Sequence, residues 1–161
     1  MSSSRVGHVL IAVAVSAATL VLIAGPAAAH IEPKPTSVKP GSRATVAFNV
    51  EHGCGESGKE SPTTKLTFKI PKRAKHVVAV VKAGWNESVS GGTVVFEGGP
   101  LGAHTQDTFS ITFTAPKKKT VLVWKVIQNC VVGVTRWIDT SKSATEPPPR
   151  VGVGVKVALP S

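Results

Sequence analysis

Apolar and polar residues alternate with a period of two along much of the chain. The alternation is clearest in residues 43–50 (RATVAFNV), 65–70 (KLTFKI) and 108–114 (TFSITFT), where every second side chain is apolar. A period of two is typical of β-strands that bury one face and expose the other to water. Each of these three segments is therefore predicted to be a strand with one buried face.

Residues 121–127 (VLVWKVI) are more continuously apolar and predict one strand buried on both faces. Turn-forming pairs such as Pro40-Gly41 and Gly91-Gly92 separate the predicted strands, and no segment has a helical period. Seven to nine short antiparallel strands predict an all-β sandwich of the immunoglobulin or cupredoxin kind. Shorter strands are predicted at residues 76–81, 93–97, 134–138 and 151–157.

The first part of the chain has the pattern of a secretory signal peptide. Arg5 precedes an apolar run over residues 9–24, and the small residues Ala27-Ala28-Ala29 follow. The run is shorter than the about 20 residues that span a bilayer comfortably. We therefore predict that residues 1–29 are removed and that residues 30–161 form one extracytoplasmic domain, in the periplasm or at the cell surface. Retention of the segment as a membrane anchor is the alternative.

The net charge and the aromatic content indicate which classes of binding partner to expect. The chain has 19 Lys and Arg against 9 Asp and Glu, a net charge of +10, which favours anionic partners. Aromatic residues make up only 5%, too few for a surface that stacks nucleic-acid bases. A secreted chain is instead expected to meet an anionic cell-envelope surface, and no nucleic acid. Lys117–Lys119 is the one basic run and is predicted to be a solvated turn.

The two cysteines, Cys54 and Cys130, lie in the predicted mature domain. In an oxidising compartment such a pair usually forms a disulfide, and a loop of this length would stabilise the fold by about 4 kcal/mol in the chain-entropy model. The rival interpretation makes the two thiolates metal ligands. That interpretation lacks a methionine partner, because the initiator is the only Met. We predict the disulfide.

The sequence has no nucleophile elbow G-x-S-x-G, no Walker loop and no H-E-x-x-H. The chain is therefore not expected to be an enzyme. One chemical feature stands out, because cleavage after Ala29 would place His30 at the N-terminus. Its amine and ring nitrogens would form a chelate that suits Cu(II), and the ordinary α-amine pKa of about 7.7 makes deprotonation easy.

The order of short motifs resembles the YcnI-like family of bacterial envelope proteins. The resemblance covers nearly all of the predicted mature chain. The motifs are A-H-I-E-P at 29–33, K-P-G-S at 39–42, H-G-C-G at 52–55, S-P-T-T-K at 61–65, A-G-W at 83–85, E-G-G-P-L at 97–101, W-K-V-I-Q-N-C at 124–130 and G-V-T-R-W at 133–137.

This resemblance implies a β-sandwich that binds copper, with a copper chaperone or a copper-import membrane protein as partner. It also implies a single-histidine brace made of the N-terminal His, a Trp and a carboxylate. Carried onto this chain, the histidine is His30 and the tryptophan is Trp137; Trp85 and Trp124 compete, but Trp124 lies in the most apolar predicted strand and is expected in the core.

The carboxylate of the implied site is left open among three residues. Asp107 is preferred from its place near Phe109, and Glu32 and Glu51 are the alternatives. Three functions compete accordingly: a Cu(II)-binding protein for storage or hand-over, a metal-free immunoglobulin-like structural or adhesion module, and a copper oxidase. The oxidase would need a second imidazole, and neither the motifs nor the spacing single out His52, His76 or His104 for that role.

Overall fold

The computed structural model describes residues 31–55 and 59–158. The predicted signal peptide and His30 therefore lie outside the described residues. The described residues form twelve strands and no helix, so none of them belongs to a helix that could cross a membrane. The strands are β1 Glu32–Lys34, β2 Ser37–Val38, β3 Arg43–Val50, β4 Thr63–Lys69, β5 Lys75–Ala79, β6 Trp85–Ser90, β7 Thr93–Leu101, β8 Asp107–Thr114, β9 Thr120–Val123, β10 Lys125–Cys130, β11 Val134–Trp137 and β12 Arg150–Val153.

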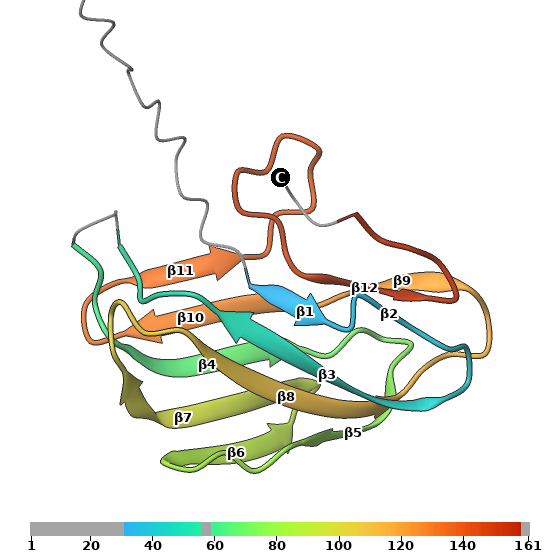
Figure 1. Ribbon diagram of the computed structural model, residues 1–161, viewed down its shortest axis with the longest axis horizontal. Helices are drawn as coiled ribbons and strands as arrows, with labels where there is room; N and C mark the ends of the chain where they lie inside the picture. The colour runs from blue at the N-terminus through green and yellow to red at the C-terminus, as the bar shows by residue number, and fades with distance from the viewer. Residues whose placement is uncertain (1–30, 56–58, 159–161) are drawn as a thin grey trace, which may run out of the picture.

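Two larger sheets carry the fold (Figure 1). One has four strands in the order β1-β3-β8-β5, and the other has five in the order β11-β10-β4-β7-β6. A small third sheet joins β2, β12 and β9. All pairs are antiparallel except that of β2 with β12. The predicted all-β sandwich is confirmed.

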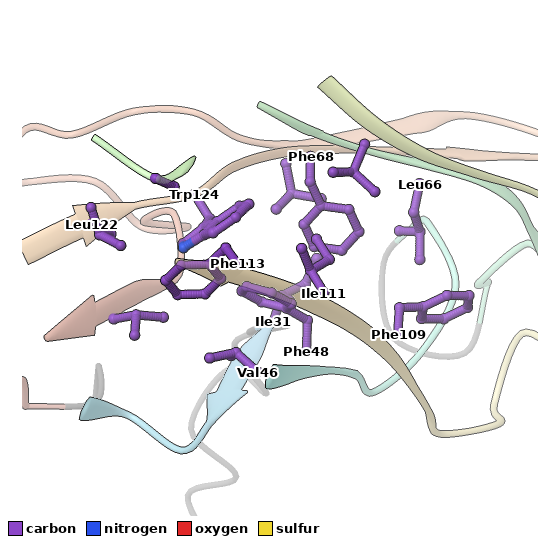
Figure 2. Close-up of a cluster of buried hydrophobic side chains, with 14 of the residues drawn as sticks. Ile31, Val46, Phe48, Leu66, Phe68, Phe109, Ile111, Phe113, Leu122 and Trp124 are labelled. Atoms are coloured by element: carbon purple, nitrogen blue, oxygen red, sulfur yellow. The ribbon is translucent and has the colours of Figure 1, made fainter. Parts of the chain in front are cut away.

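The core lies between the two larger sheets and follows the period of two. In β3 the side chains of Val46, Phe48 and Val50 are buried, while the residues between them face outward. Figure 2 shows this layer, in which the ring centroid of Phe48 lies 5.0 Å from that of Phe68 and 5.4 Å from that of Trp124. Full burial of each such side chain contributes about 1.5–3 kcal/mol. The alternation in sequence thus sets which face of each strand becomes core.

The prediction for residues 121–127 is wrong in one respect. These residues belong to two strands in different sheets, β9 and β10, rather than to one strand. The chain passes between the sheets at Trp124, whose backbone N–H donates to the carbonyl of Pro149 at 2.9 Å. Trp124 is fully buried, as expected, but Val121 is 40% exposed and Lys125 faces solvent. Neither strand is therefore buried on both faces.

Candidate metal centre

Three strand ends meet at one end of the four-stranded sheet. Glu32, the first residue of β1, lies opposite Asn49 near the end of β3. Val50, the last residue of β3, lies opposite Asp107, the first residue of β8. The structure therefore gathers all three predicted carboxylates, those of Glu32, Glu51 and Asp107, at the same end of this sheet. The residue that follows His30 is located here as well.

The three carboxylates do not share one face. Glu51 follows β3 directly, two positions after Asn49, and side chains two apart on extended backbone point to the same side. Glu32 lies opposite Asn49, so Glu32 and Glu51 are neighbours on the outer face. Asp107 lies opposite the buried Val50 and belongs to the inner rim of the sandwich. Glu32 and Glu51 are both partly buried residues.

Asp107 already has a cationic partner. The ammonium Nζ of Lys82 lies 2.7 Å from Asp107 Oδ1, and the backbone N–H of Thr108 donates to the same oxygen at 2.7 Å. Lys82 Nζ also lies 5.0 Å from the ring centroid of Phe109, within range of a cation–π contact. A metal ion bound by Asp107 would have to compete with this ammonium. Glu32 and Glu51 have no ion pair with any other described residue.

The tryptophans occupy different environments. Trp137 ends β11 opposite Val126 and is only 2% exposed. It belongs to the same buried cluster as Ile31, the residue directly after His30. Trp85 is half-buried and packs edge-on against Phe109, with 4.8 Å between ring centroids. The structure therefore places Trp137 inside the sandwich rather than on its surface.

A groove of about 190 Å³ runs beside the start of β1. One wall is Ile31, Glu32 and Pro33, and the other is formed by residues 147–150 with Ala158. Three consecutive prolines, Pro147–Pro149, make most of the second wall apolar. Among the described residues of the lining, Glu32 is the one that is acidic.

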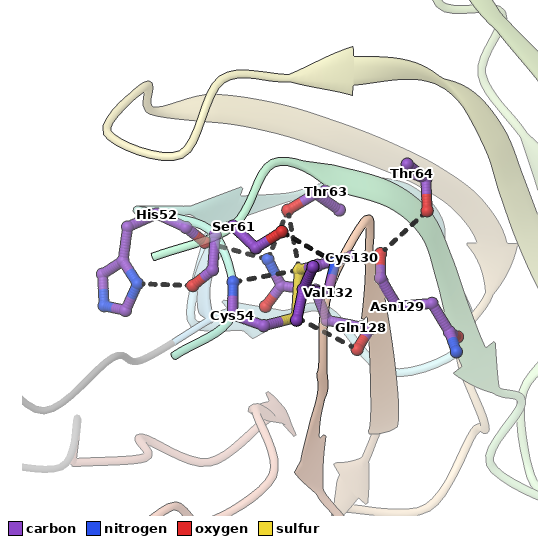
Figure 3. Close-up of a disulfide and its surroundings, with 10 residues drawn as sticks. His52, Cys54, Ser61, Thr63, Thr64, Gln128, Asn129, Cys130 and Val132 are labelled. Atoms are coloured by element: carbon purple, nitrogen blue, oxygen red, sulfur yellow. Dashed lines mark hydrogen bonds between the residues drawn. A yellow bond between two sulfur atoms is a disulfide. The ribbon is translucent and has the colours of Figure 1, made fainter. Parts of the chain in front are cut away.

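Cys54 and Cys130 form a disulfide, with 5.9 Å between their Cα atoms (Figure 3). The pairing is as predicted, so the two cysteines are not thiolate ligands. It ties the segment after β3 to the end of β10. The first glycine of the H-G-C-G motif, Gly53, leaves no room for a side chain, because a Cβ atom there would lie 1.9 Å from the carbonyl oxygen of Ser61.

Gln128 is a structural residue of this end that the sequence patterns did not indicate. It is fully buried, and its Nε2 donates to the carbonyl of His52 at 2.8 Å and to the hydroxyl of Thr63. Gln128 occupies an inward-facing position of β10, where the period of two leads one to expect an apolar core residue. The amide instead satisfies a backbone carbonyl where the chain leaves β3, which holds the segment before Cys54 against β10.

Within residues 31–55 and 59–158, no group of three or more His, Cys, Asp or Glu side chains is arranged to hold a metal ion. His52 makes a contact of 2.7 Å between Nδ1 and the carbonyl of Gly53. His104 lies 3.5 Å from a carboxylate oxygen of Glu60, and His76 contacts the hydroxyl of Thr114. A centre with three such side chains would therefore need at least one residue outside these ranges, where His30 lies.

Two solved structures resemble this fold. An uncharacterized protein from Nocardia farcinica with an immunoglobulin-like fold matches with a TM-score of 0.64 and 14% identity, over 77% of this chain and 97% of that one. The N-terminal domain of the Streptococcus gordonii adhesin Sgo0707 matches with a TM-score of 0.50 and 12% identity, over 77% of this chain. The match covers 32% of the adhesin chain. The first of these likenesses shows an immunoglobulin-like fold.

No curated protein matches the sequence. A family profile does match, over residues 30–94 and 86–153, and its description is a domain of unknown function, DUF1775. These two segments cover most of the chain, including every strand described above. The chain therefore belongs to the DUF1775 family.

Proposed function

We propose that this protein is an extracytoplasmic Cu(II)-binding protein that holds the metal through its mature N-terminal His30 and stores the ion or hands it over. DUF1775 membership supports the proposal together with the ordered motifs that resemble the YcnI-like copper-binding family. The disulfide supports secretion, because such bonds persist in oxidising compartments. The immunoglobulin-like fold supports a module without catalytic activity.

The observation that carries the proposal is the meeting of strand ends at the start of β1. Ile31 is 4% exposed and belongs to the core, so the chain is fixed in place one residue after His30. Two acidic side chains, Glu32 and Glu51, lie on the outer face at this same end. An amine and an imidazole from His30 next to a carboxylate make a donor set that suits Cu(II).

Asp107, the carboxylate preferred from the sequence, is not the one that we propose for the metal. Asp107 is neutralised by Lys82 at 2.7 Å and faces the inner rim. Glu32 and Glu51 have no such partner among the described residues and share a face. We therefore propose that Glu51 or Glu32 offsets the charge of the metal, with Glu51 preferred. Glu32 is the alternative; it directly follows the buried Ile31 and also lines the groove.

Trp137 has a supporting part in this proposal. Its indole N–H is a donor only and offers no lone pair to a metal. Because the side chain is 2% exposed, its contact with the site would come from the core, through the π-face or by excluding water. A copper chaperone or a copper-import membrane protein remains the proposed partner, and the groove beside the start of β1 is the nearest surface for such a protein.

A copper titration followed by electron paramagnetic resonance tests the proposal. The mature protein should bind one Cu(II) with a spectrum typical of nitrogen ligation, and His30→Ala should weaken binding at least about tenfold. His104→Ala is the matched control, because this imidazole is exposed and lies at the same end of the sandwich. Equal losses for both variants would contradict the proposal and favour a metal-free structural or adhesion module.

A further inference from the structure

Basic side chains gather at the end of the sandwich opposite the disulfide. They come from three connections, β2–β3, β4–β5 and β8–β9, which lie at the right-hand end of Figure 1, and from the first residues of β3 and β5. All of them are exposed. We call this group the cationic pole, and its members are Lys39, Arg43, Lys72, Arg73, Lys75, Lys117, Lys118 and Lys119.

The sheet register brings two of the connections together. Thr114, the last residue of β8, lies opposite Arg43 at the start of β3 and opposite Lys75 at the start of β5. The backbone N–H of Gly41 donates to the carbonyl of Pro116 at 3.0 Å. The β2–β3 turn is thus hydrogen-bonded to the residue that precedes the lysine run.

The third connection is held by a side chain. Arg73 Nη1 donates to the hydroxyl of Thr120, the first residue of β9, at 3.3 Å. Lys117–Lys119 was predicted to be a solvated turn, and these residues are indeed exposed. In the structure, the other five cations of the pole, which come from distant parts of the sequence, lie beside this run. Their positions are set by backbone pairing, so the pole is a fixed feature of the fold.

No acidic residue of the described ranges lies in these connections. Glu32, Glu51, Glu60 and Asp107 lie at the disulfide end, and the others are Glu87 and Glu97 in β6 and β7 and Asp139 and Glu146 after β11. None of the eight cations of the pole has an ion pair within the described residues. Like charges held together without partners repel each other. An anionic partner would remove this repulsion.

We propose that the cationic pole docks the protein on the surface of an anionic lipid bilayer. The eight charges are spread over the three connections and the adjoining strand starts at this end of the sandwich. Such a spread matches a plane of anionic headgroups better than a single bound phosphate. Six of the eight are lysines, whose compact charge suits a diffuse anionic surface, whereas the arginine fork suits discrete phosphates. Clustered basic residues bind anionic lipids in this way.

Docking through the pole sets the orientation of the molecule. The start of β1, Glu51 and Asp107 lie at the opposite end of the sandwich, so they would point away from the bilayer. The candidate metal centre would then be open to the aqueous side, which favours a soluble copper chaperone over a membrane protein of the same bilayer as its partner. The inference itself rests on the charge distribution and holds for the metal-free protein.

Flotation of the metal-free secreted protein with lipid vesicles tests this inference. Vesicles with about one third phosphatidylglycerol in phosphatidylcholine should bind the protein at about 0.1 M salt and release it at about 0.5 M, while pure phosphatidylcholine should not bind it. Replacing Lys117, Lys118 and Lys119 by Gln should weaken binding at least about tenfold. The triple change Lys72→Gln, Arg73→Gln and Lys75→Gln should have a similar effect.

The matched control removes three exposed cations outside the pole, by Lys59→Gln, Arg136→Gln and Lys142→Gln. It has the same net charge as each pole variant and should lose less than about threefold. Equal losses in control and pole variants would overturn the inference, because net charge alone would then explain binding. Failure to bind vesicles would also overturn it, including the case in which a soluble phosphodiester polymer binds instead.

A measurement without mutations locates the contact. Hydrogen exchange in the three connections of the pole should slow when anionic vesicles are added, and exchange in residues 59–62 at the disulfide end should not change. Protection at the disulfide end instead of the pole would contradict the proposed orientation.

Discussion

Lys82 Nζ lies 2.7 Å from Asp107 Oδ1 at the rim where β8 begins. The pair is partly exposed, with Lys82 at 19% and Asp107 at 36% of their side-chain surface. Asp107 therefore has a structural role in holding Lys82 over the ring of Phe109. This pairing separates Asp107 from the two outer carboxylates and leads to a test of which carboxylate serves the metal.

We predict that Glu51→Gln weakens Cu(II) binding by the mature protein at least about tenfold, because it removes the charge that offsets the metal. Asp107→Asn should change the affinity less than about threefold, because Lys82 already neutralises this carboxylate. Isothermal titration of both variants measures the difference. The reverse order of effects would show that Asp107 is the carboxylate that serves the metal. A loss of affinity only in Glu32→Gln would show that Glu32 is.

The disulfide should contribute strongly to the free energy of unfolding. The double variant Cys54→Ser with Cys130→Ser should lose about 4 kcal/mol of unfolding free energy, because the unfolded chain regains the entropy of a long loop. Urea unfolding of the variant and of the oxidised protein measures the loss. A comparable loss on reduction of the native protein is the control. A loss under about 1 kcal/mol in both would contradict the stabilising role.

Much of the fold was predictable because burial follows the period of two. The segment 43–50 is a strand with the bounds that its alternation predicts, and Cys54 pairs with Cys130 as compartment and count suggest. Strand β6 (WNESVS) was missed, because a mostly exposed edge strand has little apolar alternation. The split at Trp124 was missed because both halves are apolar and only the sheet assignment separates them.

The candidate site was less predictable, since it depends on register between distant segments. Only the pairing of β3 with β8 shows that Asp107 faces inward, and only the pairing of β1 with β3 shows that Glu51 lies beside the start of β1. The partner of Asp107, Lys82, lies 25 residues away in sequence. The cationic pole has the same origin, because Arg43 and Lys75 become neighbours only across the end of β8.

The pKa of Asp139 should lie below the ordinary value of 3.8. The largest cause is the backbone N–H of Ser141, which donates to Oδ1 at 2.8 Å, followed by the Ser141 hydroxyl, which donates to Oδ2 at 3.0 Å. A carboxyl whose pKa is lowered by folding stabilises the fold above its unfolded pKa, and this contribution is lost as pH falls through the folded pKa.

Ser141→Ala removes the hydroxyl but keeps the backbone donor. It should therefore raise the pKa of Asp139 while leaving it below 3.8. A nuclear magnetic resonance titration of the Asp139 carboxyl carbon measures both values. An unchanged midpoint would show that the hydroxyl has no part, and a return to 3.8 would show that the backbone bond has none.

The free N-terminal amine of His30 is the donor on which the proposed copper site depends most, and one added residue tests it most directly. A mature protein with a single Gly ahead of His30 keeps every side chain of the native protein but converts the His30 amine into an amide. We predict that its Cu(II) affinity falls at least about tenfold and that its electron paramagnetic resonance spectrum changes, because one nitrogen donor is lost. The same affinity and spectrum with and without the added Gly would contradict the account.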